Sequence, residues 1–107
     1  MHTLLALRCA PQSGKPLDAK AAAGYAVQVP AWIIDSASIS REFKFHNYYE
    51  TIAFVNLVAF ISHREDHHPD LEVGYNRCVV RYSTHSVGGL SVNDFICAAK
   101  IDAAILQ

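Results

Sequence analysis

The clearest pattern in the chain is an alternation of apolar and polar residues between positions 39 and 46. One set comprises Ile39, Arg41, Phe43 and Phe45, and the other comprises Ser40, Glu42, Lys44 and His46. Successive strand residues point to opposite faces, so this stretch is predicted to be a half-buried strand of an antiparallel sheet. A second alternation places Cys78, Val80 and Tyr82 on one face of another strand. Trp32 to Ile34 suggests a further short strand.

Gly74, Tyr75 and Asn76 interrupt a strand-like run and favour a hairpin turn, because glycine and asparagine tolerate positive φ. Antiparallel pairing around this turn joins positions whose numbers sum to about 151. Asp66 would then lie opposite His85, and His68 opposite Ser83. Two polar segments are therefore expected to meet at the open end of one hairpin.

Three helices are indicated by their N-terminal signals. Asp18 could cap a short helix through Ala22 or beyond, and Asn47 with Glu50 has the spacing of a capping box that opens a helix to about Glu65. The segment 91–94 is a second capping signature, which opens a helix to about residue 106. The expected buried faces consist of Ile52, Val55, Ala59 and Ser62, widened by Tyr48, Phe54 and Val58, and of Phe95, Ala99, Ala103 and Leu106.

The predicted order is helix, strand, strand, helix, strand, strand, helix. This order indicates an α+β fold in which helices pack on one face of a four-stranded antiparallel sheet. The 107 residues are expected to form one domain. Residues 1–16 contain Pro11, Gly14 and Pro16, and we expect a loose lead-in with no structure of its own there.

Composition narrows the class of protein. Hydrophobic residues make up 51% of the chain and charged residues 18%, with a net charge of −1, which argues against disorder and against a general nucleic-acid surface. The three cysteines form no CxxC pair and are expected to be reduced thiols. The start lacks the pattern of a signal peptide, and the apolar stretch 52–61 is too short to span a bilayer. We therefore expect a soluble, cytoplasmic protein.

Three of the six histidines fall in the two polar segments: His67, His68 and His85. A single histidine is most often a surface or structural residue, but two converging polar segments favour a site. Neighbouring histidines point in different directions, so one imidazole could orient a ligand while another moves a proton. The end of the preceding helix would favour a protonated imidazole by about 1 kcal/mol or less.

A metal site is an alternative use of the same region. His63 and His67 are four residues apart on a helix end, which is also a metal-ligand spacing. Together with His85 they could serve a metal-dependent hydrolase. The cysteines do not support this alternative, and no glutamate follows the first histidine directly.

Several motifs together resemble the pterin-4a-carbinolamine dehydratase family. They are Asp66-His67-His68-Pro69, Tyr75, Ser83-Thr84-His85, Gly89-Leu90, Asp94 and Ala98, with Trp32 and Arg41-Glu42-Phe43-Lys44-Phe45 upstream. The resemblance covers about Trp32 to Asp102. Ser86 departs from it, because family members usually carry an acidic residue after the Thr-His pair.

The resemblance implies dehydration of a 4a-hydroxytetrahydropterin, the 4a-carbinolamine, to the quinonoid dihydropterin. This reaction recycles the tetrahydropterin of aromatic amino acid hydroxylases and implies no metal or organic cofactor. The implied catalytic residues are His67, His68 and His85, with His67 and His85 as the proton-transfer pair and His68 as the main pterin-binding residue. The implied pterin-binding set is Asp66, His67, His68, Pro69, Ser83, Thr84, His85 and Ser86.

We also expect a homo-oligomer, because a small sheet leaves unpaired edges and the helices carry more apolar surface than it covers. The resemblance suggests a tetramer assembled from dimers, and it implies an aromatic amino acid hydroxylase as a partner enzyme. Neither a nucleic acid nor a membrane is expected as a direct partner. The alternative function is that of a protein-binding module, a dimerisation cofactor in transcription regulation.

Overall fold

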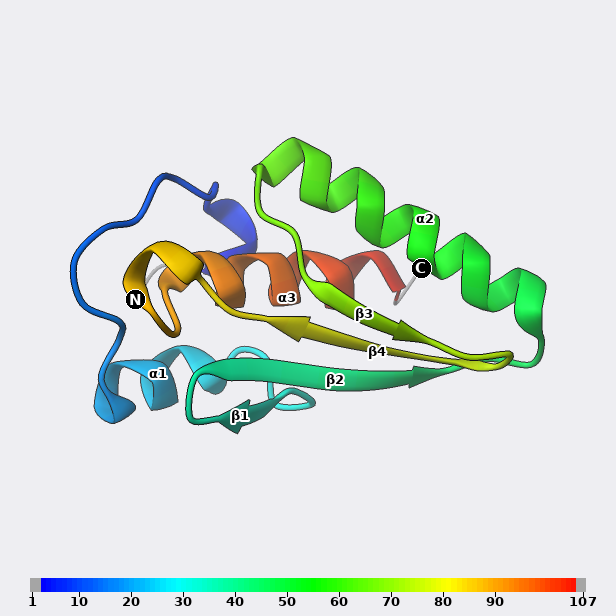
Figure 1. Cartoon of the computed structure of the whole chain (residues 1–107), viewed down its shortest axis with the longest axis horizontal. Helices are drawn as coiled ribbons and strands as arrows, with labels where there is room; N and C mark the ends of the chain where they lie inside the picture. Colours follow the sequence, from blue (N-terminus) through cyan, green and yellow to red (C-terminus); the bar gives the residue numbers. More distant parts are fainter. Residues whose placement is uncertain (1–2, 106–107) are drawn as a thin grey trace.

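The computed structural model describes residues 3–105, and its elements follow the predicted order (Figure 1). The strands are β1 (Ile33–Asp35), β2 (Ser38–Lys44), β3 (Asp70–Val73) and β4 (Arg77–Tyr82). The helices are α1 (Ala19–Ala26), α2 (Tyr48–Glu65) and α3 (Val92–Ile105), with short 3-10 helices η1 (Leu4–Ala6) and η2 (His85–Val87). The prediction of an α+β fold is confirmed.

The four strands form one antiparallel sheet in the order β1-β2-β4-β3. Asp70 pairs with Arg81, and Val73 pairs with Cys78. The pairing register expected from the turn at residues 74–76 is therefore confirmed. The ladder begins at Asp70, so Asp66 and His68 lie beyond the paired residues.

The core lies between one face of this sheet and the helices. On the two central strands, the inward side chains predicted from the alternation are buried except for one: Ile39, Phe43, Cys78, Val80 and Tyr82 are buried. The exception, Arg41, is half-buried and reaches Asp102 of α3 at 2.7 Å. Phe45, predicted to continue this face, follows the end of β2 and is half-buried. Helices α2 and α3 run along this side of the sheet (Figure 1), so their facing residues complete the core.

Helix α2 begins as predicted but buries a different face. The Asn47 side chain accepts a hydrogen bond from the Glu50 amide at 2.9 Å, whereas the Glu50 carboxylate accepts from the His46 amide and not from Asn47. The buried residues are Thr51, Phe54, Val58, Ile61 and Glu65. Of the expected stripe, Phe54 and Val58 are buried, Tyr48 and Ala59 are exposed, and the rest are half-buried. Apolar residues of this helix occur on several of its sides, so tertiary packing decides which face is buried.

Helix α3 also differs from its predicted stripe. It begins at Val92, as the capping signature indicates, and Phe95 is fully buried. Ala99 and Ala103 are only half-buried, and the expected Leu106 lies outside the described residues. The face against the core instead consists of Asp94, Ile96, Cys97, Ala98 and Ile101 with Phe95.

The lead-in is not loose. Residues 9–16 form no helix or strand, as expected, but Leu4 in η1 is completely buried. The Cys9 amide donates to the Glu65 carboxylate at 2.8 Å, and Ala10 exchanges two hydrogen bonds with the Asn93 side chain. Local sequence patterns do not predict these hydrogen bonds, because the bonded residues are far apart in the chain. Within residues 3–105, no helix is long and apolar enough to cross a membrane.

The contrast between Ile39 and Ile33 tests this assignment of the core. Ile39 is fully buried on β2, whereas Ile33 on β1 is 70% exposed. We expect Ile39→Ala to lower the free energy of unfolding by about 2–5 kcal/mol, because it leaves a cavity. Ile33→Ala should change it by about 0.5 kcal/mol or less. Urea denaturation of both variants measures the difference, and equal losses would contradict the assigned inward face.

Candidate active site

The end of α2 sets the direction of His67. Asp66 caps the helix in the left-handed conformation, with φ 52° and ψ 44°, and it is the only non-glycine residue with positive φ among residues 3–105. The His67 amide then donates to the Ser62 carbonyl at 3.2 Å, a closing pattern typical of helix ends. Pro69 follows and prevents the helix from resuming. The chain therefore turns back, and the His67 side chain points toward α3.

The imidazole of His67 is held by a buried carboxylate. Its Nε2 lies 2.6 Å from Asp94 Oδ1, and Asp94 is completely buried in the first turn of α3. The other carboxylate oxygen, Oδ2, accepts hydrogen bonds from the Thr84 hydroxyl and the Ser91 amide, each at 2.9 Å. Asp94 thus acts as an acceptor throughout, so Nε2 of His67 carries the hydrogen of this contact. The second ring nitrogen, Nδ1, then has a lone pair that can accept a proton.

Tyr82 fixes the same imidazole from its face. The two rings stack with centroids 5.5 Å apart and planes 15° from parallel. Tyr82 is fully buried, and burial raises the pKa of its hydroxyl, which therefore stays protonated. The phenol acts here as an apolar platform and not as a proton donor. His67 is consequently restrained both at its edge and on its ring face.

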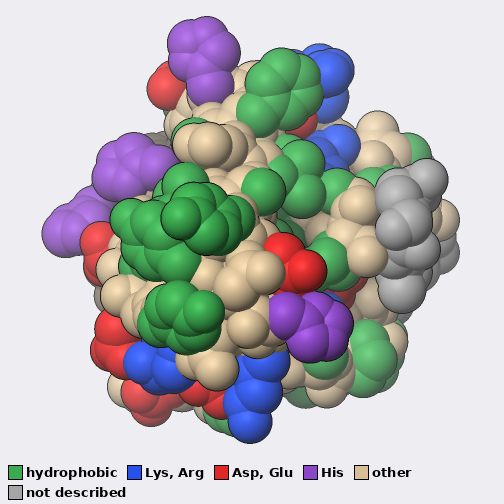
Figure 2. Space-filling view, turned by 90° about the vertical axis from the view of Figure 1, so that its right-hand side faces the viewer, with side chains coloured by type: hydrophobic (Ala, Val, Ile, Leu, Met, Phe, Trp, Pro, Cys, Tyr) green, Lys and Arg blue, Asp and Glu red, His purple; other side chains and the backbone are tan. Residues whose placement is uncertain are grey.

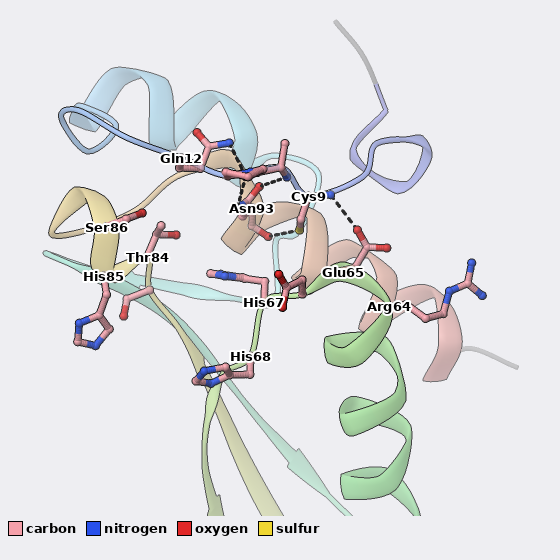
Figure 3. A pocket seen from close by; sticks show the side chains of 14 residues that line it. Cys9, Gln12, Arg64, Glu65, His67, His68, Thr84, His85, Ser86 and Asn93 are labelled. Carbon is pink, nitrogen blue, oxygen red and sulfur yellow. Dashed lines mark hydrogen bonds between the residues drawn. The ribbon is translucent and has the colours of Figure 1, made fainter.

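A cavity of about 590 Å³ opens beside His67, within the range typical of small-molecule sites. Figure 3 shows His67 between the end of α2 and the segment 83–86, with His68 and His85 at the rim. The lining residues are Cys9, Ala10, Pro11, Gln12, Arg64, Glu65, Asp66, His67, His68, Ser83, Thr84, His85, Ser86 and Asn93. The structure thus brings together the two polar segments that the hairpin register predicted.

The predicted binding set and the cavity overlap closely but differ in detail. Pro69 is in the predicted set but not among the lining residues. Thr84 lines the cavity, yet it is buried and its hydroxyl is engaged by Asp94 and Ser91. Its main contribution is therefore to position the carboxylate. The exposed rings of His68 and His85 remain accessible to a ligand.

Sequence reasoning missed two groups of site residues. Asp94 was recognised in a capping signature and in the family resemblance, but not as the partner of His67. The lead-in residues 9–12 were expected to be loose, whereas they form one wall of the cavity. Glu65 holds this wall, since its buried carboxylate accepts from the Cys9 amide and pairs with Arg8 at 3.0 Å. No local sequence pattern predicts these long-range contacts.

The metal alternative lacks a ligand set in this geometry. Across residues 3–105, no group of three or more histidine, cysteine, aspartate or glutamate side chains is placed to hold a metal ion. His63, His67 and His85 therefore do not converge on a common centre.

Comparison with known proteins identifies the same family that the motifs of the histidine site resemble. Residues 15–104 match the family model described as pterin 4 alpha carbinolamine dehydratase. The chain belongs to this family. The match includes every residue of the histidine segments and Asp94, but it begins after the lead-in residues that line the cavity.

Relatives in several bacteria carry the same family name, each provisionally named a pterin-4-alpha-carbinolamine dehydratase. A protein of Nitrosospira multiformis is 65% identical over 75 residues, which cover 70% of this chain and 66% of the relative, about two thirds of its length. A protein of Nitrosomonas europaea is 53% identical and the match covers 89% and 87% of the two chains. One from Stenotrophomonas maltophilia is 53% identical, covering 94% and 90%.

Solved structures show the same fold. A transcriptional coactivator/pterin dehydratase from Brucella melitensis superposes with a TM-score of 0.76 at 27% identity, covering 83% of this chain and 97% of that one. A pterin dehydratase-like protein, identified as a RuBisCO assembly factor in the alpha-carboxysome, superposes with a TM-score of 0.56 at 20% identity, covering 67% and 83%. The second likeness concerns the fold alone.

Replacing Asp94 tests the carboxylate network. In Asp94→Asn, an amide NH₂ would face one of three donors at a buried position. We expect the free energy of unfolding to fall by about 1–3 kcal/mol. Asp70→Asn makes the same substitution at an exposed position on β3 and should have little effect. Thermal denaturation compares the two variants, and wild-type stability in Asp94→Asn would contradict the network.

Proposed function

We propose that this chain dehydrates a 4a-hydroxytetrahydropterin, the 4a-carbinolamine, to the quinonoid dihydropterin. The observation that carries the proposal is a cavity of about 590 Å³ with three histidines on it, one of them fastened to a buried carboxylate. Membership of the family supports the substrate class. The reaction removes hydroxide from C4a and a proton from the pterin ring, so it needs one acid and one base of near-neutral pKa, and imidazoles can serve as both.

The geometry favours His67 as the base. Its Nε2 hydrogen points to Asp94, so Nδ1 presents a lone pair that can accept the ring proton. Asp94 then stabilises the imidazolium that forms, as carboxylates paired with catalytic histidines do. Tyr82 restricts the ring orientation, so the base is already positioned before the ligand binds.

His85 and His68 are assigned the remaining roles. His85 begins η2 on the cavity rim and is exposed, so it can donate a proton to the departing hydroxide. His68 follows His67 directly, lines the same cavity and is more exposed (Figure 3), so we assign it to contact with the pterin. Proton transfer between these imidazoles and the pterin accounts for the reaction without a metal or organic cofactor. The product would be returned to the tetrahydropterin pool of aromatic amino acid hydroxylases.

A homo-oligomer is part of this proposal. Strand β3 lies at the edge of the sheet, and its apolar residues Leu71 and Val73 are 36% and 44% exposed. Pairing of two β3 edges would satisfy their free backbone groups and cover these side chains. Figure 2 shows further hydrophobic side chains gathered at the end of the molecule where α2 starts and the β3–β4 turn lies. Exposed aromatic side chains at the start of α2 and in the β3–β4 turn are Tyr48, Tyr49 and Tyr75, and a second interface there would give the dimer of dimers.

The protein-binding alternative rests on exposed aromatic residues of α2. Tyr49 is 81% exposed and Phe60 is 60% exposed, and neither lines the histidine cavity. The Brucella melitensis relative is described as a transcriptional coactivator as well as a pterin dehydratase. A second role in binding a partner protein would therefore leave the catalytic cavity free.

The roles of the three histidines can be separated kinetically with freshly generated 4a-carbinolamine. We expect His67→Ala and His85→Ala each to lower kcat about tenfold or more, with little change in KM, because each removes a proton-transfer group. His68→Ala should mainly raise KM. The uncatalysed reaction limits each single loss, so the His67→Ala/His85→Ala double variant should fall below either.

The control is His46→Ala, an exposed histidine paired with Glu50 outside the cavity. It should retain wild-type kinetics. Wild-type kinetics in the double variant, with an intact circular dichroism spectrum, would place the active site elsewhere.

Oligomer formation can be measured by light scattering at micromolar concentration. We expect the wild-type mass to be a multiple of the 11.8 kDa protomer, and we expect Val73→Lys to reduce it, because a lysine on an edge strand opposes pairing. Val27→Lys changes another exposed valine beyond α1 and should not alter the mass. A monomeric wild-type protein would overturn the proposal.

A further inference from the structure

We propose that Cys9 and Cys97 form a dithiol site that a hydroperoxide oxidises to an intramolecular disulfide, fastening the lead-in to α3 beside the histidine cavity. The two Sγ atoms lie 3.6 Å apart, close enough for one thiol to donate a hydrogen bond to the other. They are 88 positions apart in the sequence, so only the folded chain brings them together.

The pair lies between the cavity wall and the backbone of His67. Cys97 is fully buried on α3, three residues after Asp94, and its Sγ is 3.9 Å from the His67 carbonyl. Cys9 is half-buried in the lead-in, where it lines the cavity (Figure 3), and its Sγ is 3.6 Å from the Asn93 carbonyl. One thiol is therefore reachable from the cavity, and the other lies directly behind it.

The geometry needs only a small adjustment to form a bond. A disulfide has an S–S length of about 2.05 Å, so the sulfur atoms must approach by about 1.5 Å. Cys97 is held in a helix, whereas Cys9 belongs to a segment without regular structure. The movement can therefore be taken up by the lead-in. Cys78 offers a contrast, because it is fully buried on β4 and its sulfur contacts the Val79 carbonyl at 4.0 Å.

The oxidation balances with a hydroperoxide as the only reagent. Hydrogen peroxide enters through the cavity and reacts with Cys9: an S–O bond forms, the O–O bond breaks and water leaves. The Cys97 sulfur then attacks the Cys9 sulfur, so that the S–S bond forms and the S–O bond breaks. The released hydroxide takes the Cys97 proton and leaves as a second water. Two thiols thus lose two electrons and two protons, and one peroxide becomes two waters.

The environment of Cys9 determines how fast this step runs. The hydrogen bond with Cys97, followed by burial, raises the pKa of the Cys9 thiol, and the nearby Glu65 carboxylate acts in the same direction. Because the thiolate is the reactive form, the reaction is slow at neutral pH and accelerates as the pH rises. The site suits sustained oxidation better than a rapid response.

The disulfide would make the lead-in a permanent wall of the cavity. In the reduced protein residues 9–12 are held there by hydrogen bonds to Glu65, Asn93 and Cys97. The family model matches from residue 15 onward, so Cys9 lies outside the region that this model matches. Formation of this disulfide does not depend on the identity of the substrate.

The 107-residue chain is incubated with hydrogen peroxide at several pH values, quenched with acid, alkylated and digested without reduction for mass spectrometry. We expect a peptide linking Cys9 to Cys97, lighter by two hydrogens than its separate parts and lost on treatment with dithiothreitol. Cys78 should remain alkylated as a free thiol. The linked peptide should form faster as the pH rises, and the oxidised protein should have a higher Tm, because the bond closes a long loop.

Two variants complete the test. Cys9→Ser changes a half-buried residue and should retain the fold while abolishing both the linked peptide and the rise in Tm. Cys78→Ala removes the unrelated thiol and should leave the linked peptide unchanged. Recovery of Cys9 and Cys97 as free thiols, as separate sulfinic acids or as links between chains would overturn the proposal.

Discussion

The carboxylate of Asp94 connects the parts of the molecule that make the site. A fully buried carboxylate is costly unless donors surround it, and the donors here come from three separate segments. His67 follows α2, Thr84 follows β4, and Ser91 precedes α3. Satisfying one buried group therefore fixes how the end of the longest helix meets the end of the central strand. The cavity lies at this meeting point.

This constraint gives the three histidines different properties. His67 is restrained by Asp94 at one nitrogen and by Tyr82 on its face, so a single nitrogen is presented to a ligand. His68 and His85 are exposed and can adjust to what binds. A fixed imidazole beside two adaptable ones suits the proposed reaction, in which a proton and a hydroxide leave from different atoms of the pterin.

The lead-in shows how a segment without secondary structure becomes part of a site. Buried Glu65 accepts the Cys9 amide and pairs with Arg8, while Asn93 holds Ala10. These contacts place the backbone of residues 9–12 over the cavity. They also bring the thiols of Cys9 and Cys97 together. The segment that forms one wall of the cavity therefore also carries a pair of thiols.

The sequence alone determined the features that depend on neighbouring residues. The Gly-Tyr-Asn turn set the register of β3 with β4, Asn47 and Ser91 marked helix starts, and alternation identified the inward face of β2. The tertiary structure decided which face of α2 and α3 is buried, because apolar residues occur around both helices. It also decided that Asp94 holds His67 and that the lead-in is a wall. Hydrogen bonds between residues far apart in the chain leave no periodic signal. In addition, the capping signature 91–94 already explains an aspartate at position 94, so the sequence does not suggest its bond to His67.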